Sequence, residues 1–494
     1  MNEVIVAIDA GTTGVRSVAV DRSGVPLLHA AREFPQYFPA PGLVEHDADE
    51  IWAATVATLA EVVERLEGRP IVAVGITNQR ETVVPWSRRT GRPVGRAIVW
   101  QDRRTADVCD RLVAEGVLPL VRERTGLVLD PYFSGTKIGW LRTSGRIDGD
   151  DDVFGTVDAW LLWNLTGGAV CATDPSNASR TLLYDIRRGG WDPELCDVFG
   201  VDPASLPDVV GSSGRLGHTA AGVSPLPAGV TIGGIAGDQQ AALCGQACFE
   251  IGMTKNTYGT GSFVLMNVGT TCPPTVDGLL TTVAWQLADG STTYAYEGAV
   301  FATGAAVQWL RDGLGIITTA AETEVLAASC ADTGGVYLVP AFAGLGAPWW
   351  DPWARGTIVG LHRGTGRAEL ARATVEAMAY QTRDVLDAMR AASGRDVRAL
   401  RVDGGASVMD LMLQIQADQL GVVVQRPTVT ETTALGAAFL AGLGTGVWSS
   451  PAEVARSWQL ERTFTPAADR GPAEDAYTGW LRAVERSRGW ARGH

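Results

Sequence analysis

Two polar stretches in this sequence combine residue types that can bind hydroxyl groups and accept a proton. The first, residues 75–82, reads GITNQRET and places Arg80 next to Glu81 after a strand-forming run. A guanidinium and a carboxylate side by side can clamp vicinal hydroxyls, because one donates hydrogen bonds and the other accepts them. Adjacent Arg and Glu are more commonly an exposed surface pair. A strand end, however, is where α/β domains place binding residues, and this position favours a binding role.

The second stretch, residues 234–241, reads GIAGDQQA and contains Asp238. Val230–Ile235 is predicted to be a strand and a helix to begin near Asp238, a position that would also suit a helix N-cap. Phosphoryl transfer to an alcohol needs a carboxylate near the attacking hydroxyl to accept its proton. Asp238 is therefore a candidate general base.

A glycine- and threonine-rich turn near the N-terminus is suited to holding phosphate. Residues 9–14 of this turn separate the predicted strands Val4–Ile8 and Val15–Asp21. Its glycines allow close approach of a ligand, its hydroxyl and amide groups attract anions, and Asp9 at a strand end suits Mg²⁺. An ordinary β-hairpin is the alternative. A second strand–Gly-Thr–strand pattern at residues 256–269 favours two similar domains that each present such a turn to one cleft.

The remaining pattern is that of an α/β protein. Apolar spacing predicts strands over Val25–Glu33, Ile71–Ile76 and Ala399–Val402, and helices over Asp47–Leu66, Gly304–Arg311, Ala368–Ser393 and Ala434–Leu443. The strand at 71–76 should run parallel to the first strand, because a helix crosses between them. Asp47 is a candidate N-cap, and the small residues of the last helix allow close packing.

Composition limits the function classes. The 494 residues are too many for one ordinary core, so two large domains are expected. A net charge of −14 argues against a nucleic-acid or anionic-membrane surface, and no apolar run approaches the ~18 residues of a membrane span. The seven scattered cysteines are expected to be reduced thiols, and we expect a cytoplasmic protein. A P-loop is excluded, because neither Lys137 nor Lys255, the two lysines, stands in the required motif.

Taken together, these motifs resemble those of the FGGY carbohydrate kinases, in the superfamily of sugar kinases, actin and heat-shock chaperones. Residues 130–137 resemble the first FGGY signature and residues 356–376 the second, and the resemblance extends from Ile5 to about Trp448. It implies an α/β fold with two ribonuclease-H-like (actin-like) domains flanking a deep cleft. The expected boundaries are 1–249 and 250–450, followed by a helical tail at 451–494 of unassigned role.

The resemblance is strongest to those members that phosphorylate glycerol, and it implies transfer of the γ-phosphoryl group of ATP to glycerol with Mg²⁺ near Asp9. It implies that Asp238 is the catalytic base and that the polyol is held by Arg80, Glu81, Trp100, Tyr132, Asp238, Gln239 and Phe263. Trp100 and Phe263 would form an apolar wall against the substrate carbons, although core packing is the ordinary role of a tryptophan at a strand end.

Nucleotide contacts are likewise implied by the resemblance. The matching residues are Thr12, Thr13, Gly14, Arg16, Thr260, Gly304, Gln308, Gly405 and Met409. The last position departs from the family, which usually has asparagine there. A thioether cannot make the hydrogen bonds of an amide, so we expect looser nucleoside recognition.

Three further expectations accompany this interpretation. A kinase for another polyol or a ketopentose is the nearest alternative, and a non-catalytic nucleotide-dependent switch is an alternative from another class. We expect a homo-oligomer, dimer or tetramer.

Some bacterial family members are inhibited by fructose 1,6-bisphosphate at a loop containing glycine and arginine. Residues 219–229, the matching segment here, contain no arginine or lysine, so we expect no such response.

Overall fold

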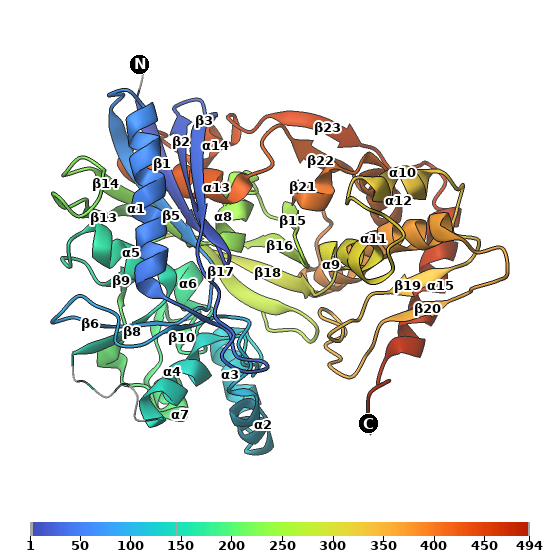
Figure 1. The fold of residues 1–494 in the computed structure, drawn as a ribbon, viewed down its shortest axis with the longest axis horizontal. Helices are drawn as coiled ribbons and strands as arrows, with labels where there is room; N and C mark the ends of the chain where they lie inside the picture. The colour runs from blue at the N-terminus through green and yellow to red at the C-terminus, as the bar shows by residue number, and fades with distance from the viewer. Residues whose placement is uncertain (1–2, 145–146, 148, 150, 493–494) are drawn as a thin grey trace.

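The computed structural model describes residues 3–144, 147, 149 and 151–492, and it contains two large sheets, one in each half of the molecule (Figure 1). The first sheet has the order β13-β14-β5-β1-β2-β3. Its strands are β1 Val4–Ala10, β2 Gly14–Asp21, β3 Pro26–Glu33, β5 Ile71–Asn78, β13 Ser213–His218 and β14 Thr231–Gly237. β1 pairs antiparallel with β2 and parallel with β5, which confirms both predictions.

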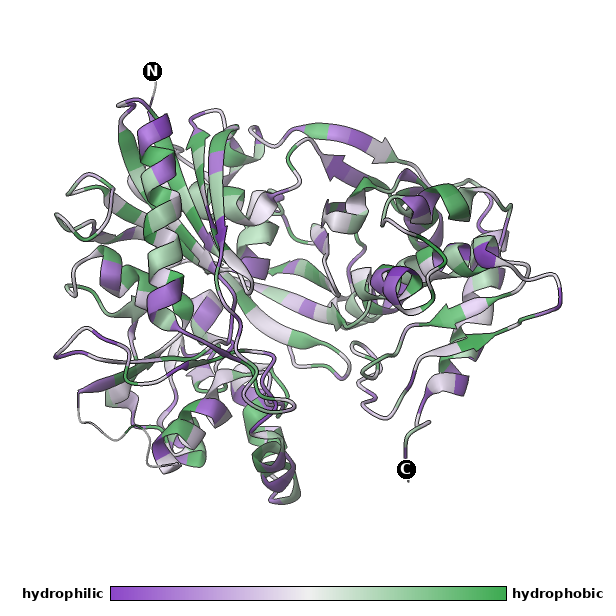
Figure 2. Cartoon of the chain, viewed as in Figure 1, coloured by the Kyte–Doolittle hydropathy of each residue, from purple (hydrophilic) through white to green (hydrophobic). Residues whose placement is uncertain are grey.

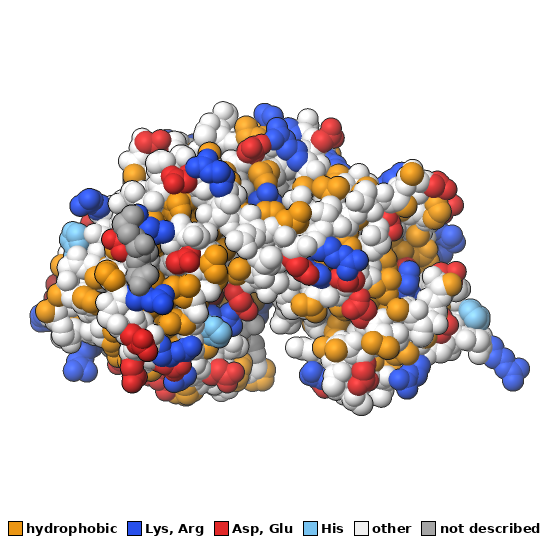
Figure 3. Space-filling view, turned by 90° about the horizontal axis from the view of Figure 1, so that it is seen from above, with side chains coloured by type: hydrophobic (Ala, Val, Ile, Leu, Met, Phe, Trp, Pro, Cys, Tyr) orange, Lys and Arg blue, Asp and Glu red, His pale blue; other side chains and the backbone are white. Residues whose placement is uncertain are grey.

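The second sheet repeats this arrangement, in the order β17-β18-β16-β15-β21-β22-β23. Its strands are β15 Thr254–Tyr258, β16 Ser262–Gly269, β17 Leu280–Gln286, β18 Thr292–Val300, β21 Leu400–Gly404, β22 Val424–Pro427 and β23 Leu460–Phe464. β15 corresponds to β1, since it pairs antiparallel with β16 and parallel with β21. The predicted α/β class with two similar halves is confirmed. The lobes built on the two sheets are separated by an indentation of the surface (Figure 3).

Helices pack against both sheets. The principal ones are α1 Ala48–Arg65, α5 Val157–Leu165, α8 Asp238–Gly245, α11 Arg367–Ser393, α12 Asp410–Leu420 and α13 Thr432–Thr445. Of these, α5, α8 and α13 are buried along most of their length. Asp47 caps α1 as predicted, because its carboxylate accepts the N–H of Asp49 at 3.0 Å. Figure 2 shows hydrophilic residues interspersed with hydrophobic ones along α1. The buried residues of this helix include Ile51, Leu59 and Val62.

Smaller elements surround this framework. In the first half they are β4 Glu45–His46, β6 Val84–Ser87, β7 Ala97–Ile98, α2 Ala106–Ala114, α3 Leu118–Thr125, α4 Ser134–Thr143, β8 Asp152–Gly155, β9 Ala172–Thr173, α6 Pro175–Ala178, β10 Tyr184–Asp185, β11 Gly190–Trp191, α7 Pro193–Phe199, η1 Pro203–Ser205 and β12 Asp208–Val209. In the second half they are α9 Gly304–Gln308, η2 Trp309–Gly313, α10 Glu322–Ala328, β19 Tyr337–Val339, β20 Thr357–Val359, η3 Gly405–Val408, α14 Pro451–Ala455 and α15 Gly471–Ser487.

Helix α13 joins the two halves, because it follows the second sheet in sequence but packs on the first. Its small residues allow it to cross α8 closely, as the sequence predicts. A Cβ atom at Gly436 would lie 1.8 Å from the Ala241 carbonyl oxygen, and one at Gly245 would lie 2.0 Å from that of Thr432. Both contacts are shorter than any real Cβ contact, so this crossing requires glycine on each helix.

The C-terminal tail contacts both halves of the molecule: Val454 of α14 packs into the core that contains β1 and α13, whereas β23 and α15 pack on the second half. β23 pairs with β22 at the edge of the second sheet. Trp480 of α15 is fully buried and donates its indole N–H to Asp384 of α11 at 2.9 Å, and Tyr477 donates to the same carboxylate at 2.6 Å. Burial raises the pKa of Asp384 to about 6. The tail therefore contributes to the core of the second half.

Candidate active site

Arg80 and Glu81 lie just beyond the end of β5 and are buried, with 2% and 1% of their surfaces exposed. The alternative of an exposed surface pair is therefore wrong. β14 lies beside β5 and runs parallel to it, which brings the residues that follow both strands together. The guanidinium Nε of Arg80 lies 3.1 Å from Oδ1 of Asp238, and its Nη2 donates to the Tyr132 hydroxyl at 3.3 Å.

Asp238 is the first residue of α8, and Gly237 occupies the N-cap position. The carboxylate is therefore not the N-cap that the alternative interpretation required. About a third of its side chain is exposed. Among the described residues, both of its close contacts fall on Oδ1, which accepts the Gln239 backbone N–H at 2.7 Å and faces Arg80. This arrangement leaves Oδ2 to accept a proton.

Aromatic side chains from both halves border this cluster. The ring centroids of Trp100 and Tyr132 are 5.6 Å apart, edge to face, and the Trp100 indole N–H donates to the Thr12 hydroxyl at 2.9 Å. Phe263 comes from β16 of the second sheet, and its ring centroid is 5.8 Å from the Arg80 guanidinium carbon. The predicted apolar wall residues therefore lie around the same arginine.

Two buried charged residues that the sequence analysis did not identify complete a four-residue ion cluster with Arg80 and Glu81. Glu297 of β18 accepts from Arg80 at 2.5 and 3.1 Å and from Arg180 at 3.0 Å. Arg180 also donates to Glu81 at 2.7 Å. The two guanidinium groups lower the pKa of Glu297 to about 2, against the opposing effect of its burial. Two arginines and two glutamates leave the cluster without net charge.

A buried lysine, also missed, lies beside the predicted polyol residue Gln239. Lys255 of β15 donates from Nζ to Gln239 Oε1 at 2.5 Å and to the Thr257 hydroxyl at 2.8 Å. Burial lowers the pKa of Lys255 to about 8, although the carboxylates of Asp403 and Asp238 act in the opposite direction. The sequence did hold a signal for it, because lysine is so rare in this chain and Lys255 directly precedes the second Gly-Thr pattern.

The segment after β9 positions the backbone that precedes Asp238. The Ser176 hydroxyl accepts the Gly237 N–H at 2.9 Å and donates to the Asp174 carboxylate at 2.9 Å. Asp174 also accepts the Ser212 hydroxyl at 2.5 Å. These buried hydrogen bonds hold the junction of β14 and α8 in place.

Asp9, predicted as the metal residue, is half-buried near the end of β1. Burial and the neighbouring Asp238 carboxylate raise its pKa to about 7, while Arg16 acts to lower it. A divalent cation bound at Asp9 would offset the unfavourable burial of its negative charge. The described residues contain no group of three or more His, Cys, Asp or Glu side chains that could hold a metal ion. The donor set fits Mg²⁺, which takes one or two carboxylates and completes its shell with waters and phosphates.

The predicted nucleotide residues of the first half lie in and after the β1–β2 turn. Thr12 is half-buried, whereas Thr13 is exposed. The carbonyl oxygen of Gly14 closes the turn by accepting the N–H of Gly11 at 2.9 Å. Arg16 forms an ion pair with Glu431, which immediately precedes α13.

The predicted nucleotide residues of the second half form two groups. Thr260 is exposed in the β15–β16 turn, and its carbonyl oxygen accepts the N–H of Ala305 at 3.0 Å, next to Gly304 at the start of α9. Gln308 is exposed at the end of that helix. Gly405 is the first residue of η3. Met409 is the N-cap residue of α12, and it is buried, 7% exposed, in the apolar core of the second half.

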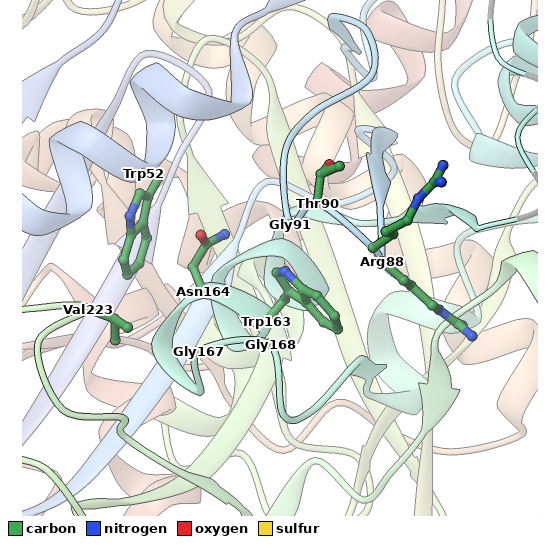
Figure 4. A pocket seen from close by; sticks show the side chains of 10 residues that line it. Trp52, Arg88, Thr90, Gly91, Trp163, Asn164, Gly167, Gly168 and Val223 are labelled. Carbon is green, nitrogen blue, oxygen red and sulfur yellow. The ribbon is translucent and has the colours of Figure 1, made fainter.

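A separate surface cavity of about 540 Å³ contains none of the predicted site residues (Figure 4). It is lined by Trp52, Arg88, Arg89, Thr90, Gly91, Trp163, Asn164, Gly167, Gly168 and Val223. Both of its arginines already have partners, because Arg88 donates to the Leu206 carbonyl oxygen at 3.3 Å and Arg89 lies 3.3 Å from the Asp151 carboxylate.

Comparison with known proteins identifies both halves of the chain. Residues 4–245 match the model for the N-terminal domain of the FGGY family of carbohydrate kinases, and residues 254–445 match that for its C-terminal domain. A glycerol kinase of Trichlorobacter lovleyi is 55% identical over 99% of both chains.

Two solved structures extend the comparison. A Plasmodium falciparum glycerol kinase with ADP superimposes with a TM-score of 0.93 at 33% identity, covering 98% of each chain. A ligand-bound xylulose kinase from Lactobacillus acidophilus reaches a TM-score of 0.88 at 20% identity over 99% of each chain, which shows the common fold alone.

Proposed function

The chain belongs to the FGGY family of carbohydrate kinases, and we propose that it is an ATP:glycerol 3-phosphotransferase. It transfers the γ-phosphoryl group of ATP to glycerol and releases sn-glycerol 3-phosphate and ADP. The observation that carries this proposal is the 55% identity with a glycerol kinase over 99% of both chains. The cluster around Arg80 supports it, because that cluster offers both donors and acceptors to a small polyol.

In this proposal the first half supplies every polar contact to glycerol, and the second half supplies Phe263 of β16. Glu81 and Asp238 accept hydrogen bonds from hydroxyl groups, and Arg80, Tyr132 and Gln239 donate to hydroxyl oxygens. Trp100 and Phe263 contact the carbon chain. The hydrogen bonds of Arg80 to Glu297 hold its guanidinium in one orientation before the substrate arrives. That orientation reduces the entropy lost on binding.

Asp238 is the general base of the proposed mechanism. Its Oδ2 accepts the proton of the attacking hydroxyl, while Oδ1 is held by the Gln239 N–H and by Arg80. The exposed third of the side chain gives the substrate access to this oxygen. General bases of this kind contribute about 10²–10⁴-fold to a rate.

The two Gly-Thr turns hold the phosphates, and the second half binds the rest of ATP. Thr12, Thr13 and Gly14, with Arg16 behind them, face the β- and γ-phosphates from the first half, and Thr260 does so from the second. Asp9 would hold Mg²⁺, which when bound neutralises charge on the phosphates. Gly304, Gln308, Gly405 and Met409 contact the nucleoside. Closure of the two halves would exclude water, which otherwise competes with glycerol as phosphoryl acceptor.

We assign these roles to domains at residues 1–249 and 250–450, followed by a tail at 451–494 whose β23 and α15 pack on the second lobe. A homo-oligomer, dimer or tetramer, is proposed and is tested by light scattering of the purified protein.

A cytoplasmic location is proposed from the use of ATP, and the seven cysteines, all free, agree with a reducing compartment. None of the described helices is long and apolar enough to cross a membrane.

The proposed function is tested by ADP release with glycerol, erythritol, xylitol, dihydroxyacetone and xylulose as acceptors. We expect the highest kcat/KM with glycerol. A higher value with another polyol or with the ketopentose would favour the related-kinase alternative. Binding of ATP without acceptor-dependent ADP release would favour a non-catalytic switch.

A further inference from the structure

We infer that Lys255 is a positioning residue that fixes the side-chain amide of Gln239, so that this amide presents its NH₂ group to the polyol and acts only as a hydrogen-bond donor. The inference rests on the proposed function and adds a residue from the second half to the glycerol site. It also determines that Gln239 donates, and does not accept, the hydrogen bond to the substrate.

The orientation of the amide follows from the chemistry of its neighbour. Lys255 is completely buried, and its Nζ lies 2.5 Å from the amide oxygen of Gln239. An ammonium group has three donors and no acceptor. The opposite amide orientation would place an NH₂ group against the ammonium and leave buried donors without acceptors, which is costly. The oxygen of Gln239 must therefore face Lys255, and its NH₂ group must face away.

The lysine is itself held by its surroundings. Its second hydrogen bond goes to Thr257 at 2.8 Å, and Thr257 is paired in register with Asp403 of β21. The Asp403 carboxylate is buried and accepts from Gln246 at 2.8 Å. Asp403 and Asp238 supply the negative charge that opposes the effect of burial on Lys255. The ammonium is thus fixed between the two sheets, with one hydrogen bond to each half.

A donor at Gln239 complements the acceptors already beside it. Asp238, the preceding residue, can only accept hydrogen bonds when ionised, and so can Glu81. A hydroxyl that gives its proton to Asp238 or Glu81 still needs a donor for its oxygen. Gln239 can supply that donor only while Lys255 holds its carbonyl oxygen. Lys255 and Gln239 come from different halves. The orientation of the Gln239 amide therefore also depends on how the two halves pack together.

The test is a double-mutant cycle of Lys255 and Gln239, with one further variant that replaces the donor at position 239 by an acceptor. Lys255→Met removes the ammonium with little change in volume, Gln239→Ala removes the amide, and Gln239→Glu keeps the acceptor for Lys255 but removes the donor. We expect Lys255→Met to raise the glycerol KM about tenfold, as for loss of one oriented hydrogen bond, with a smaller change in kcat. Gln239→Glu should raise the KM at least as much as Gln239→Ala. In the Gln239→Ala background, Lys255→Met should change the KM less than twofold.

The outcomes separate this inference from the proposed function. Additive effects of the two substitutions, or a Gln239→Glu variant with normal glycerol KM, would overturn the inference while the wild-type enzyme remained active on glycerol. A wild-type protein without glycerol-dependent ADP release would overturn the proposed function and the inference together. If Lys255→Met does not fold, Lys255→Gln replaces it, because its amide can still donate. That variant should then raise the KM less than Gln239→Ala does.

Discussion

The two halves of the molecule share one strand order but place different residue types at the ends of corresponding strands. In the first half, β5 leads to Arg80 and Glu81, and β14 leads to Asp238. In the second half, the corresponding strand β21 ends at Gly404 and leads to Gly405, and β22 ends at Pro427. The first half therefore presents charged side chains, and the second presents mainly backbone and apolar surface.

This difference indicates how a duplicated scaffold separates two tasks. The common strand order fixes where strand ends meet, and the residue types at those ends decide the chemistry. Two buried charged residues of the second half serve the first half, because Lys255 contacts Gln239 and Glu297 contacts Arg80 and Arg180. The comparison predicts that substitutions near the first-half strand ends change turnover or glycerol binding. Those at the second-half ends should change only the KM for ATP.

The largest expected effect belongs to Asp238→Asn. The variant keeps the shape and the Oδ1 acceptor of Asp238 but cannot accept the proton of the attacking hydroxyl. We expect kcat to fall by about 10²–10⁴-fold, while glycerol binding measured by calorimetry stays within a few-fold of normal. A near-normal kcat would show that the base lies elsewhere.

Much of the first half follows from sequence pattern. Continuous apolar runs identified β1 and β5, an alternating run identified β2, and the single intervening helix identified the parallel pairing of β1 with β5. Each of these signals is local. The hairpin of β17 and β18 was not predicted, and its polar and small residues, such as Thr281, Thr282 and Gly298, weaken the apolar alternation on which prediction depends.

The buried charges show what a single sequence cannot supply. Arg80 and Glu81 were compatible with a surface pair until burial was known. Their partners Arg180 and Glu297 lie 99 or more residues away in the chain. No spacing rule relates residues so distant. Arg180 meets Glu81 through folding of the first half, and Glu297 joins them through packing of β18 against that half. Glu297 had one visible signal, a carboxylate within the otherwise uncharged strand 292–300.

Glu297→Gln changes a residue of the second half that contacts the glycerol site of the first half. Neutralising one member of the buried cluster leaves an uncompensated arginine charge, which typically costs about 3–5 kcal/mol of folding stability. We also expect a raised glycerol KM, because Arg80 loses its fixed orientation, and an unchanged KM for ATP. Chemical denaturation and steady-state kinetics check these effects. An effect on the ATP KM alone would contradict the assignment of Glu297 to the glycerol site.

The same substitution predicts a pH dependence. The pKa of Glu297 is lowered to about 2 in the folded protein from 4.5. A lowered pKa means that the ionised carboxylate stabilises the fold above pH 4.5 and that this contribution is lost as the pH falls toward 2. The difference in unfolding free energy between wild type and Glu297→Gln should therefore be constant from pH 7 to about 5 and shrink below that. A difference that does not depend on pH would show that Glu297 is not ionised.

A smaller effect is expected for Met409→Asn in the second half. We expect the KM for ATP to fall several-fold, because one net hydrogen bond is worth roughly 0.5–1.5 kcal/mol, with glycerol KM unchanged. Met409 is also the N-cap residue of α12 and makes no side-chain capping hydrogen bond. Asparagine could cap that helix, but the exchange also removes a buried thioether from the apolar core, so we expect no net gain in folding stability. Met409→Ser is the matched control, since serine caps the helix but lacks the amide, and an equal fall in its ATP KM would assign the gain to capping.

The smallest expected effect is none at all, for fructose 1,6-bisphosphate. If fructose 1,6-bisphosphate inhibited the enzyme, activity would be controlled from a site outside the strand ends of both halves. Residues 219–229 contain no cation, and their two prolines remove two backbone donors. Recognition of a bisphosphate ordinarily takes charge-assisted donors such as an arginine fork.

Two arginines lie near this segment and are the cations that a bisphosphate could use there. Val223 lines the cavity that also contains Arg88 and Arg89 (Figure 4). Arg88 is bound to a backbone carbonyl oxygen, and Arg89 is paired with Asp151. A bisphosphate bound there would compete with Asp151 for Arg89 and would gain no cation from the segment itself. We therefore expect unchanged rates of glycerol phosphorylation at millimolar fructose 1,6-bisphosphate and saturating ATP. Saturable inhibition that disappears in Arg88→Ala or Arg89→Ala would instead identify this cavity as an effector site and contradict the prediction.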